Sequence, residues 1–296
     1  MGLRPCLAAG PEAGYDWRML SYRHAFHAGN GADVFKHSVL LCCLDYLGRK
    51  EAPLLVVDTH AGAGFYSLTE GYAAQNREWE RGVGRLLERE TLPPLLARYA
   101  ALVREALAGD GRYPGSPALI QRLLRSQDRG VCFELHPADF KLLADALGMD
   151  RRFRVAREDG LGGLKALLPP PGRRGCVFID PSYEKRSDYK AVPEKLAEAL
   201  ARFSTGVYII WYPLLRPGPG DAAPSWEALR ETLLGLGRGN RFALELFSPG
   251  GVSEKRMFGS GLAIYNPPFT LRETLEESLP ALADILGGWQ WRWHCR

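Results

Sequence analysis

The 296 residues lack several features that would assign them to particular classes of protein. No apolar run reaches the roughly 18 residues that a membrane-spanning helix needs, so we expect no membrane partner. Residues 1–18 lack the charged start and long apolar stretch of a signal peptide. The six cysteines form no C-x-x-C pair, and Cys132 and Cys176 lie in predicted strands, as buried reduced thiols do. These absences predict a soluble, cytoplasmic protein.

Metal-binding patterns are missing as well. The histidines show no pair at the i, i+4 spacing of a helical zinc site, and no cysteine cluster accompanies them. We therefore expect no metal cofactor. The excess of positive charge is small, because 38 Lys and Arg against 34 Asp and Glu leave a net charge of +4. This bias is weak evidence for a nucleic-acid partner, since many basic proteins bind none.

The sequence does contain a repeated alternation of strand and helix patterns. Helical patterns lie at 139–147, 191–203 and 225–236, between most of the predicted strands. This alternation predicts an α/β fold with a mostly parallel, doubly wound sheet. The seven predicted strands are Leu54–Asp58, Val131–Leu135, Phe153–Arg157, Cys176–Asp180, Gly206–Pro213, Phe242–Phe247 and Gly261–Asn266.

A longer stretch separates the first two predicted strands. Residues from about 65 to 113 have helical patterns and no clear strand, which predicts a helical insertion. We expect it to belong to a single domain over residues 19–296, preceded by a loose extension over residues 1–18. After the insertion, Ser116 and Pro117 are typical of a helix start, so Ser116 is either an N-cap or a ligand contact.

The stretch MLSYRHAFHAGNGADVFKH, from Met19 to His37, is too polar for a core. A buried helix is predicted from about Ala32 to Gly48, with Asn30 or Gly31 at its start. Lys36 and His37 lie near its amino end, where the helix dipole favours anions. We expect both side chains to point at an anionic ligand.

Acidic residues recur where the predicted strands end. Asp58 precedes the Gly-rich turn Thr59–Gly64, in which Gly62 would let the backbone approach a nucleotide-type ligand. This turn does not fit the pattern G-x-G-x-x-G. Glu134 ends the second strand, where a carboxylate can accept bonds from ribose hydroxyls, and Asp159 follows the third, where it could bind an adenine amino group. These positions predict a cofactor site along one edge of the sheet.

The fourth predicted strand ends in Asp180-Pro181-Ser182-Tyr183. Pro181 cannot donate to the sheet, so it stops the strand and leaves Asp180 at the carboxyl end, where ligands bind. The Asp180 carboxylate, the Pro181 carbonyl and the Tyr183 ring would form a socket for a planar amino group. The four residues resemble the Asp-Pro-Pro-Tyr motif of amino-directed methyltransferases, with Ser182 in place of the second proline.

A second segment, Asn266-Pro267-Pro268-Phe269, fits the general [DN]-P-P-[YF] pattern more closely. It follows the last predicted strand, whereas the catalytic motif of a methyltransferase of this order follows the fourth. We therefore assign the catalytic motif to Asp180.

Taken together, several segments resemble the RlmJ family of bacterial methyltransferases over residues from Met19 to the last predicted strand. The resemblance implies a Rossmann-like class I methyltransferase fold. It also implies S-adenosylmethionine-dependent methylation of the N6 amino group of an adenine in 23S ribosomal RNA. The segments are, in order, MLSYRHAFHAGNGADVFKH, DTHAGAG, YPGSP, ELHP, EDG and IDPSYE.

The resemblance implies roles for the residues at matching positions, with Asp180 as the catalytic residue and Tyr22 as a substrate contact. We also expect Pro181 and Tyr183 to take part in catalysis. We expect His24, Asn30 and Tyr183 to bind the substrate. We expect a monomer. The residues implied for the cofactor are His37, His60, Ser116, Glu134, Asp159, Gly160 and Asp180, to which the strand-end and helix patterns add Lys36, Asp58 and Gly62.

This chemistry suits an adenine amino group, which is a poor nucleophile because its lone pair is delocalised into the ring. Bonds from the amino hydrogens to Asp180 and to the Pro181 carbonyl would localise that pair toward the methyl group, while Tyr183 stacks on the base. The base must leave its stack or lie in a single-stranded region.

The residues alone leave other functions open. A nucleotide-dependent dehydrogenase could use the same fold, but it would leave Asp180-Pro181-Ser182-Tyr183 unexplained. A non-catalytic RNA-binding module would bind no cofactor. Within methyl transfer, the motif does not distinguish an RNA adenine from a DNA adenine, a protein glutamine or a small amine. Only the N-terminal resemblance points to ribosomal RNA.

Overall fold

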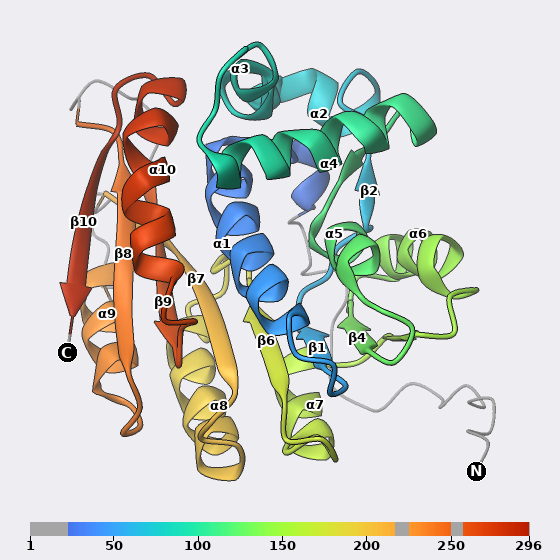
Figure 1. The fold of residues 1–296 in the computed structure, drawn as a ribbon, viewed down its shortest axis with the longest axis vertical. Helices are drawn as coiled ribbons and strands as arrows, with labels where there is room; N and C mark the ends of the chain where they lie inside the picture. Colours follow the sequence, from blue (N-terminus) through green and yellow to red (C-terminus); the bar gives the residue numbers. More distant parts are fainter. Residues whose placement is uncertain (1–22, 217–224, 250–256, 296) are drawn as a thin grey trace.

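An eight-stranded sheet forms the centre of the computed structural model, which describes residues 23–216, 225–249 and 257–295 (Figure 1). Its strand order is β10-β8-β9-β7-β6-β1-β4-β5. The strands β5, β4, β1, β6 and β7 pair in parallel, and β9, β8 and β10 extend the sheet through antiparallel pairs. Their bounds are β1 (Leu55–Asp58), β4 (Arg129–Phe133), β5 (Phe153–Ala156), β6 (Gly175–Ile179), β7 (Val207–Leu215), β8 (Arg241–Phe247), β9 (Met257–Tyr265) and β10 (Gln290–Cys295).

Helices cover both faces of this sheet, which confirms the predicted doubly wound α/β fold. The crossovers from β1 to β4 and β5 run in one direction across the sheet, and the crossover from β6 to β7 runs in the other, so right-handed connections place their helices on opposite faces. In Figure 1, the front layer is built around α1 (Gly31–Gly48) and consists also of α4 (Pro94–Asp110), α5 (Ser116–Leu123) and α10 (Leu271–Ile285). The other layer contains α7 (Gly160–Leu167), α8 (Asp188–Arg202) and α9 (Trp226–Gly235), while α6 (Pro137–Leu147) packs beside β5.

The sheet has one strand more than the seven predicted. The additional strand is β10, which pairs with β8 at the edge of the sheet. Most of its side chains are exposed or half-buried, so the segment lacks the buried apolar run by which the other strands were predicted. One aromatic contact secures it, because Trp293 packs edge-on against Phe242 with 5.1 Å between the ring centroids. The strand β7 also continues beyond its predicted end at Pro213 to Leu215.

The segment between β1 and α5 contains α2 (Gly71–Asn76), η3 (Glu78–Arg81), α3 (Val83–Leu87) and α4. The prediction that it holds no strand is wrong, because β2 (Phe65–Tyr66) pairs with β3 (Tyr113–Pro114). Strands of two residues are too short to carry a sequence pattern. This pairing closes the segment at its base and brings α5 back to the end of β1. The predicted extension, residues 1–18, lies outside the described residues.

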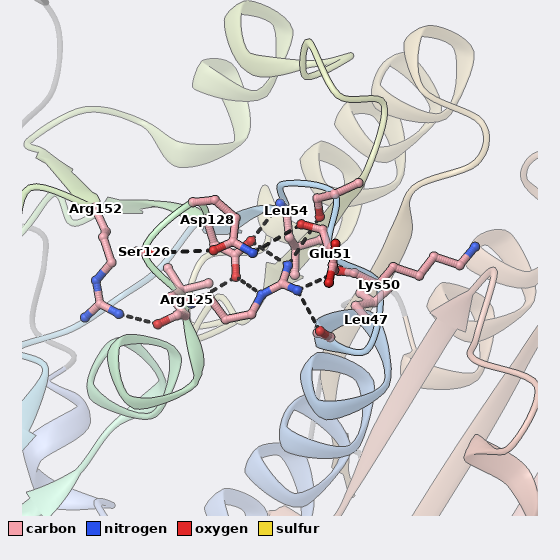
Figure 2. A network of polar contacts seen from close by, with 12 residues as sticks. Leu47, Lys50, Glu51, Leu54, Arg125, Ser126, Asp128 and Arg152 are labelled. Atoms are coloured by element: carbon pink, nitrogen blue, oxygen red, sulfur yellow. Dashed lines mark hydrogen bonds and ion pairs between the residues drawn. The ribbon is translucent and has the colours of Figure 1, made fainter.

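At its carboxyl end, α1 is fixed to the sheet by a network around Asp128 (Figure 2). Asp128 is buried, accepts from the Leu54 backbone at 2.9 Å and forms an ion pair with Arg125 at 2.8 Å. Arg125 in turn donates to the carbonyls of Gly48 and Lys50, at 2.7 and 2.6 Å. Burial raises the pKa of the Asp128 carboxyl, but the hydrogen bonds from Arg125 and Leu54 outweigh it and lower that pKa overall.

Replacing Asp128 with Asn should lower the free energy of unfolding by about 3 kcal/mol at neutral pH, because it leaves a hydrogen-bonded guanidinium without its carboxylate. Since the folded-state pKa of Asp128 lies below its unfolded value, its contribution is present above roughly pH 4 and is lost as pH falls through the folded pKa. Urea unfolding at several pH values should therefore show the difference between the two proteins shrinking in acid. The control is Glu198→Gln in the exposed pair with Lys195, for which a loss below about 0.5 kcal/mol is expected. An equal loss in both variants would contradict an anchoring role for Asp128.

Candidate active site

The carboxyl ends of the parallel strands meet at one edge of the sheet, beside the start of α1 (Figure 1). In open α/β sheets, ligands bind at this edge, where the strand order reverses. The reversal lies between β1 and β6, because the chain passes from β1 to β4 on one side and later returns to β6 on the other. Asp58 is the last residue of β1 and Asp180 follows β6 directly. The two predicted acids therefore flank the crevice.

Lys36 connects α1 to the end of β6. Its Nζ lies 2.7 Å from Oδ2 of Asp180 and 2.9 Å from Oδ1 of Asp33. The side chains of Lys36 and Asp180 are only 5% and 11% exposed, so this is a nearly buried cluster of charges. The ring centroid of Trp211, on β7, lies 5.5 Å from the same Nζ. Lys36 therefore points into the predicted site, toward protein carboxylates.

Asp33 was not among the predicted site residues. It is fully buried, and its Oδ2 accepts from the Gly29 backbone at 2.8 Å and lies 3.0 Å from Nε2 of His24. Its position three residues before Lys36 on the same helical face is the signal in the sequence that could have identified it. Asp33 fixes Lys36, and Lys36 fixes one oxygen of Asp180. The ion pair with Lys36 involves Oδ2 of Asp180.

His37 turns away from Lys36, although both were expected to point at one ligand. Its Nδ1 lies 3.1 Å from the hydroxyl of Tyr113, which in turn lies 2.7 Å from the hydroxyl of Tyr99. Burial lowers the pKa of His37 to about 3, partly opposed by the nearby Asp33 carboxylate. The imidazole is therefore neutral and joins α1 to α4 and β3. A cofactor contact by His37 remains a prediction.

Asp58 and Ser116 form a buried pair at the end of β1. Ser116 donates its hydroxyl proton to Oδ2 of Asp58 at 2.7 Å, and the His60 backbone donates to Oδ1 at 3.2 Å. Burial raises the pKa of Asp58 to about 7, and the bond from Ser116 partly opposes this. The expected N-cap role of Ser116 is wrong, because Gly115 occupies the N-cap position of α5. The hydroxyl instead satisfies an acid 58 residues away in the sequence.

The Gly-rich turn after β1 wraps around Glu134. Gly62, with φ at +61°, donates its backbone N–H to Oε2 of Glu134 at 2.8 Å, and the His136 backbone donates to Oε1 at 2.6 Å. A Cβ at Gly62 would lie 2.2 Å from the Tyr66 hydroxyl, so this position requires glycine. Burial raises the pKa of Glu134 to about 7. The hydrogen bond from Gly62 to Glu134 joins the turn after β1 to the end of β4, so the two predicted parts of the site lie side by side.

His60 and Asp159 have local partners in the structure. Thr59 donates its hydroxyl proton to the Phe178 carbonyl at 3.1 Å, so Nδ1 of His60, at 2.8 Å, must donate to that hydroxyl. Burial lowers the pKa of His60 to about 4. Asp159 caps α7 by accepting from the backbone of the first turn, and Gly160 packs so closely on Thr59 that a Cβ would lie 2.2 Å from its carbonyl. Cofactor contacts by these residues remain predictions.

Tyr183 is packed inward. Its φ is +53°, its side chain is buried, and its ring lies 5.0 Å from that of Tyr189 and 6.1 Å from that of Trp211, between centroids. Among the described residues its hydroxyl has no hydrogen-bond partner. In this arrangement the ring face is covered, and stacking on a base would require the ring to become exposed. Trp211, which lies beside both Lys36 and Tyr183, resembled a core residue in the sequence.

The N-terminal substrate residues are only partly described. Tyr22 lies outside the described residues. His24 pairs with Asp33 and packs edge-on against Tyr66, with 5.3 Å between centroids. Asn30 caps α1 by accepting from the Asp33 backbone at 3.0 Å and donates to Glu78 at 3.2 Å. Both side chains lie at the start of α1, near the site, and their contact with substrate remains a prediction.

The competing motif lies at the opposite edge. Because β9 is antiparallel to β7, its last residue, Tyr265, pairs with Tyr208 near the amino end of β7. Asn266 donates to the carbonyls of Ser204 and Gly206, at 2.8 and 2.7 Å, and so closes a turn. Phe269 is 81% exposed and far from the strand-end acids in the topology. This placement supports Asp180 as the motif residue.

Across residues 23–216, 225–249 and 257–295, no group of three or more His, Cys, Asp or Glu side chains is arranged to hold a metal ion. Within the same ranges, no helix is long and apolar enough to cross a membrane.

The chain is similar to a family of known proteins in both sequence and structure. A family model described as Ribosomal RNA large subunit methyltransferase D, RlmJ, matches residues 51–295. The chain is 38% identical to Ribosomal RNA large subunit methyltransferase J of Haemophilus influenzae over 93% of this chain and 99% of that one. It is 40% identical to the protein of the same name in Escherichia coli, over 90% and 94%. A crystal structure of a Legionella pneumophila protein superimposes with a TM-score of 0.82 at 35% identity, covering 91% of this chain and 98% of that one.

Replacing Asp58 with Asn should stabilise the protein progressively as pH rises from about 4 to 7. The raised folded-state pKa of Asp58 means that the folded chain holds this proton more tightly than the unfolded chain, so its contribution falls with rising pH across that window. Relative to the native chain, the variant should gain roughly 2–4 kcal/mol between those pH values. His37 and His60 have the opposite sign, but both proteins contain them, so they cancel in the difference. Urea unfolding of both proteins between pH 4 and 7 measures this difference in the free energy of unfolding. A difference that does not change with pH would contradict the raised pKa of Asp58.

Proposed function

This chain belongs to the RlmJ family, and from that membership we propose that it methylates the N6 amino group of an adenine in 23S ribosomal RNA, with S-adenosylmethionine as methyl donor. Two curated relatives named as large-subunit ribosomal RNA methyltransferases support the substrate. The observation that carries the chemistry is the ion pair of Lys36 with Asp180 at 2.7 Å, at the crevice where the strand order reverses.

Asp180 would align the target amino group. Lys36 holds Oδ2, which leaves Oδ1 to accept one amino hydrogen, while the Pro181 carbonyl accepts the other. With both hydrogens bonded, the nitrogen becomes more pyramidal, so its lone pair is less delocalised into the ring and is directed toward the methyl donor. As the N–C bond forms and the methyl group leaves the sulfur, the nitrogen would lose one proton to the Asp180 carboxylate. Most of the rate would then come from alignment at short distance rather than from early removal of the proton.

The strand-end residues fit an adenosyl cofactor. Gly62 and Gly64 have left-handed φ values, which residues with side chains rarely adopt. In α/β folds, a Gly-rich turn of this kind after the first strand lets a ligand approach the backbone. Glu134 would accept bonds from the ribose hydroxyls, and Asp159 would accept one from the adenine amino group. His60, Ser116 and Asp58 would line the space between them. S-adenosylmethionine supplies an electrophilic methyl group, and these residues would orient it toward the amino nitrogen of the base that Asp180 holds.

The target base would stack on Tyr183. This requires the ring to leave its contacts with Tyr189 and Trp211, so entry of the base is coupled to a movement of the loop after Pro181. Ser182, in place of a second proline, leaves that loop a less restricted backbone. Exchange of aromatic contacts with protein for contacts with a base keeps the cost of the movement small.

Methyl transfer from labelled S-adenosylmethionine tests the proposal on protein-free 23S RNA, ribosomes and DNA. We expect N6-methyladenine in the RNA, and a fall in kcat of about 10²–10⁴-fold in Asp180→Ala. The matched control is Phe269→Ala in the competing motif, which should leave the rate unchanged. Label in DNA alone would replace the substrate, and equal loss in both variants would contradict the assignment of Asp180.

Replacing Lys36 with Met should lower kcat by about 10²-fold or more with little change in affinity for S-adenosylmethionine, because Asp180 loses the group that fixes its orientation. Steady-state kinetics together with calorimetric titration of the cofactor separate the two effects. A loss confined to cofactor affinity would contradict this positioning role and assign Lys36 to cofactor binding instead.

A further inference from the structure

The antiparallel half of the sheet extends beyond the edge at which Asp180 lies. Ile179, the last residue of β6, pairs with Ile210, but β7 continues to Leu215. At roughly 3.3 Å per residue, the four steps from Trp211 to Leu215 carry β7 about 13 Å past the level of Asp180. The strand β8 ends and β10 begins at the same raised edge, because β8 runs in the direction of β7 and β10 in the opposite one.

A groove of about 510 Å³ lies at this raised edge. This volume falls within the roughly 300–1,000 Å³ typical of ligand sites. Three half-buried aromatic residues line it, Trp226 at the start of α9, Phe247 at the end of β8 and Phe258 in β9. Trp226 and Phe258 meet edge to face with 6.1 Å between their centroids. The groove therefore has an aromatic lining that comes from one helix and two strands.

Arginine side chains accompany each of these rings. Arg216, at the tip of β7, lies 5.5 Å from the Phe258 centroid, and Arg292 lies 5.4 Å from that of Phe247. Arg230 lies 5.5 Å from the Trp226 centroid and forms ion pairs with the buried Glu245 at 3.0 Å and with Glu231 at 2.8 Å, so it supports the ring rather than a phosphate. Alternating guanidinium groups and rings bind single-stranded nucleic acid, because bases stack on both and the cations meet the phosphates. The acidic side chain in the lining is Glu227.

We propose that this groove binds an unpaired nucleotide that flanks the target adenine in the same RNA. Its base stacks against Phe258 and Phe247, and its phosphate lies by Arg292. The inference rests on the proposed function, because it needs an RNA strand that leaves the crevice at Asp180 and passes along β7. A strand that follows this route reaches the groove within its next few nucleotides, since the β7 tip lies only about 13 Å beyond the crevice.

The test measures RNA binding and methyl transfer separately in Phe258→Ala, Arg292→Gln and the native chain. We expect Phe258→Ala to raise both the Kd and the KM for 23S RNA by roughly 5- to 100-fold, the range of one lost base–aromatic stack, with kcat changed less than about twofold. Arg292→Gln should weaken binding and reduce the salt slope of log Kd by about one. Affinity for S-adenosylmethionine, which reports folding, should stay unchanged in both.

The matched control is Arg49→Gln. Arg49 is exposed and lies 5.4 Å from the ring centroid of Tyr46, but at the carboxyl end of α1, at the opposite edge. Unchanged Kd and KM in both groove variants, or an equal effect of Arg49→Gln, would overturn the groove as an RNA site. Such a result in a chain that methylates RNA would leave the proposed function intact. A chain that binds RNA through the groove but transfers no methyl group would retain the groove and refute the proposed function.

Discussion

The ammonium group of Lys36 lies between the carboxylates of Asp33 and Asp180, and this arrangement requires α1 to keep a fixed position relative to the sheet. Charges this deeply buried are stabilising only when their geometry is close to ideal, since each loses its hydration. The two carboxylates come from different parts of the fold, one from α1 and one from the end of β6. A small shift of α1 relative to the sheet would therefore leave a buried charge unpaired. The position of this one helix must be fixed along its whole length.

Three separate sets of contacts fix it. At the carboxyl end, Arg125 binds the last carbonyls of α1 while Asp128 binds the first strand (Figure 2). In the middle, neutral His37 joins α1 to the tyrosines of α4 and β3. At the amino end, Asn30 caps the helix and reaches Glu78 of η3. The segment between β1 and α5 thus acts on the site indirectly, because two of these contacts come from it.

Features that depend on local sequence could be predicted, and features that depend on distant partners could not. A strand followed by proline placed Asp180 at the carboxyl edge, and the end of an apolar strand pattern placed Glu134 at the same edge. The N-cap role expected for Ser116 was wrong because its partner, Asp58, becomes a neighbour only after β2 and β3 pair. The inward position of Tyr183 depends on Trp211, which in the sequence is simply part of an apolar strand. The strand β10 escaped prediction because an edge strand needs few buried side chains.

The strand β7 runs from the crevice to the raised edge, and its side chains point alternately to the two faces of the sheet. Trp211 faces Lys36 and Tyr183, whereas the next side chain, Tyr212, faces the other layer and donates to Glu245 at 3.1 Å. Glu245 holds Arg230, which stacks on Trp226 in the groove. Consecutive residues of this strand therefore contact the proposed catalytic site on one face and support the aromatic groove on the other. If an RNA strand occupies both, the distance between them is fixed by the sheet, so the fold itself would select which nucleotide reaches Asp180.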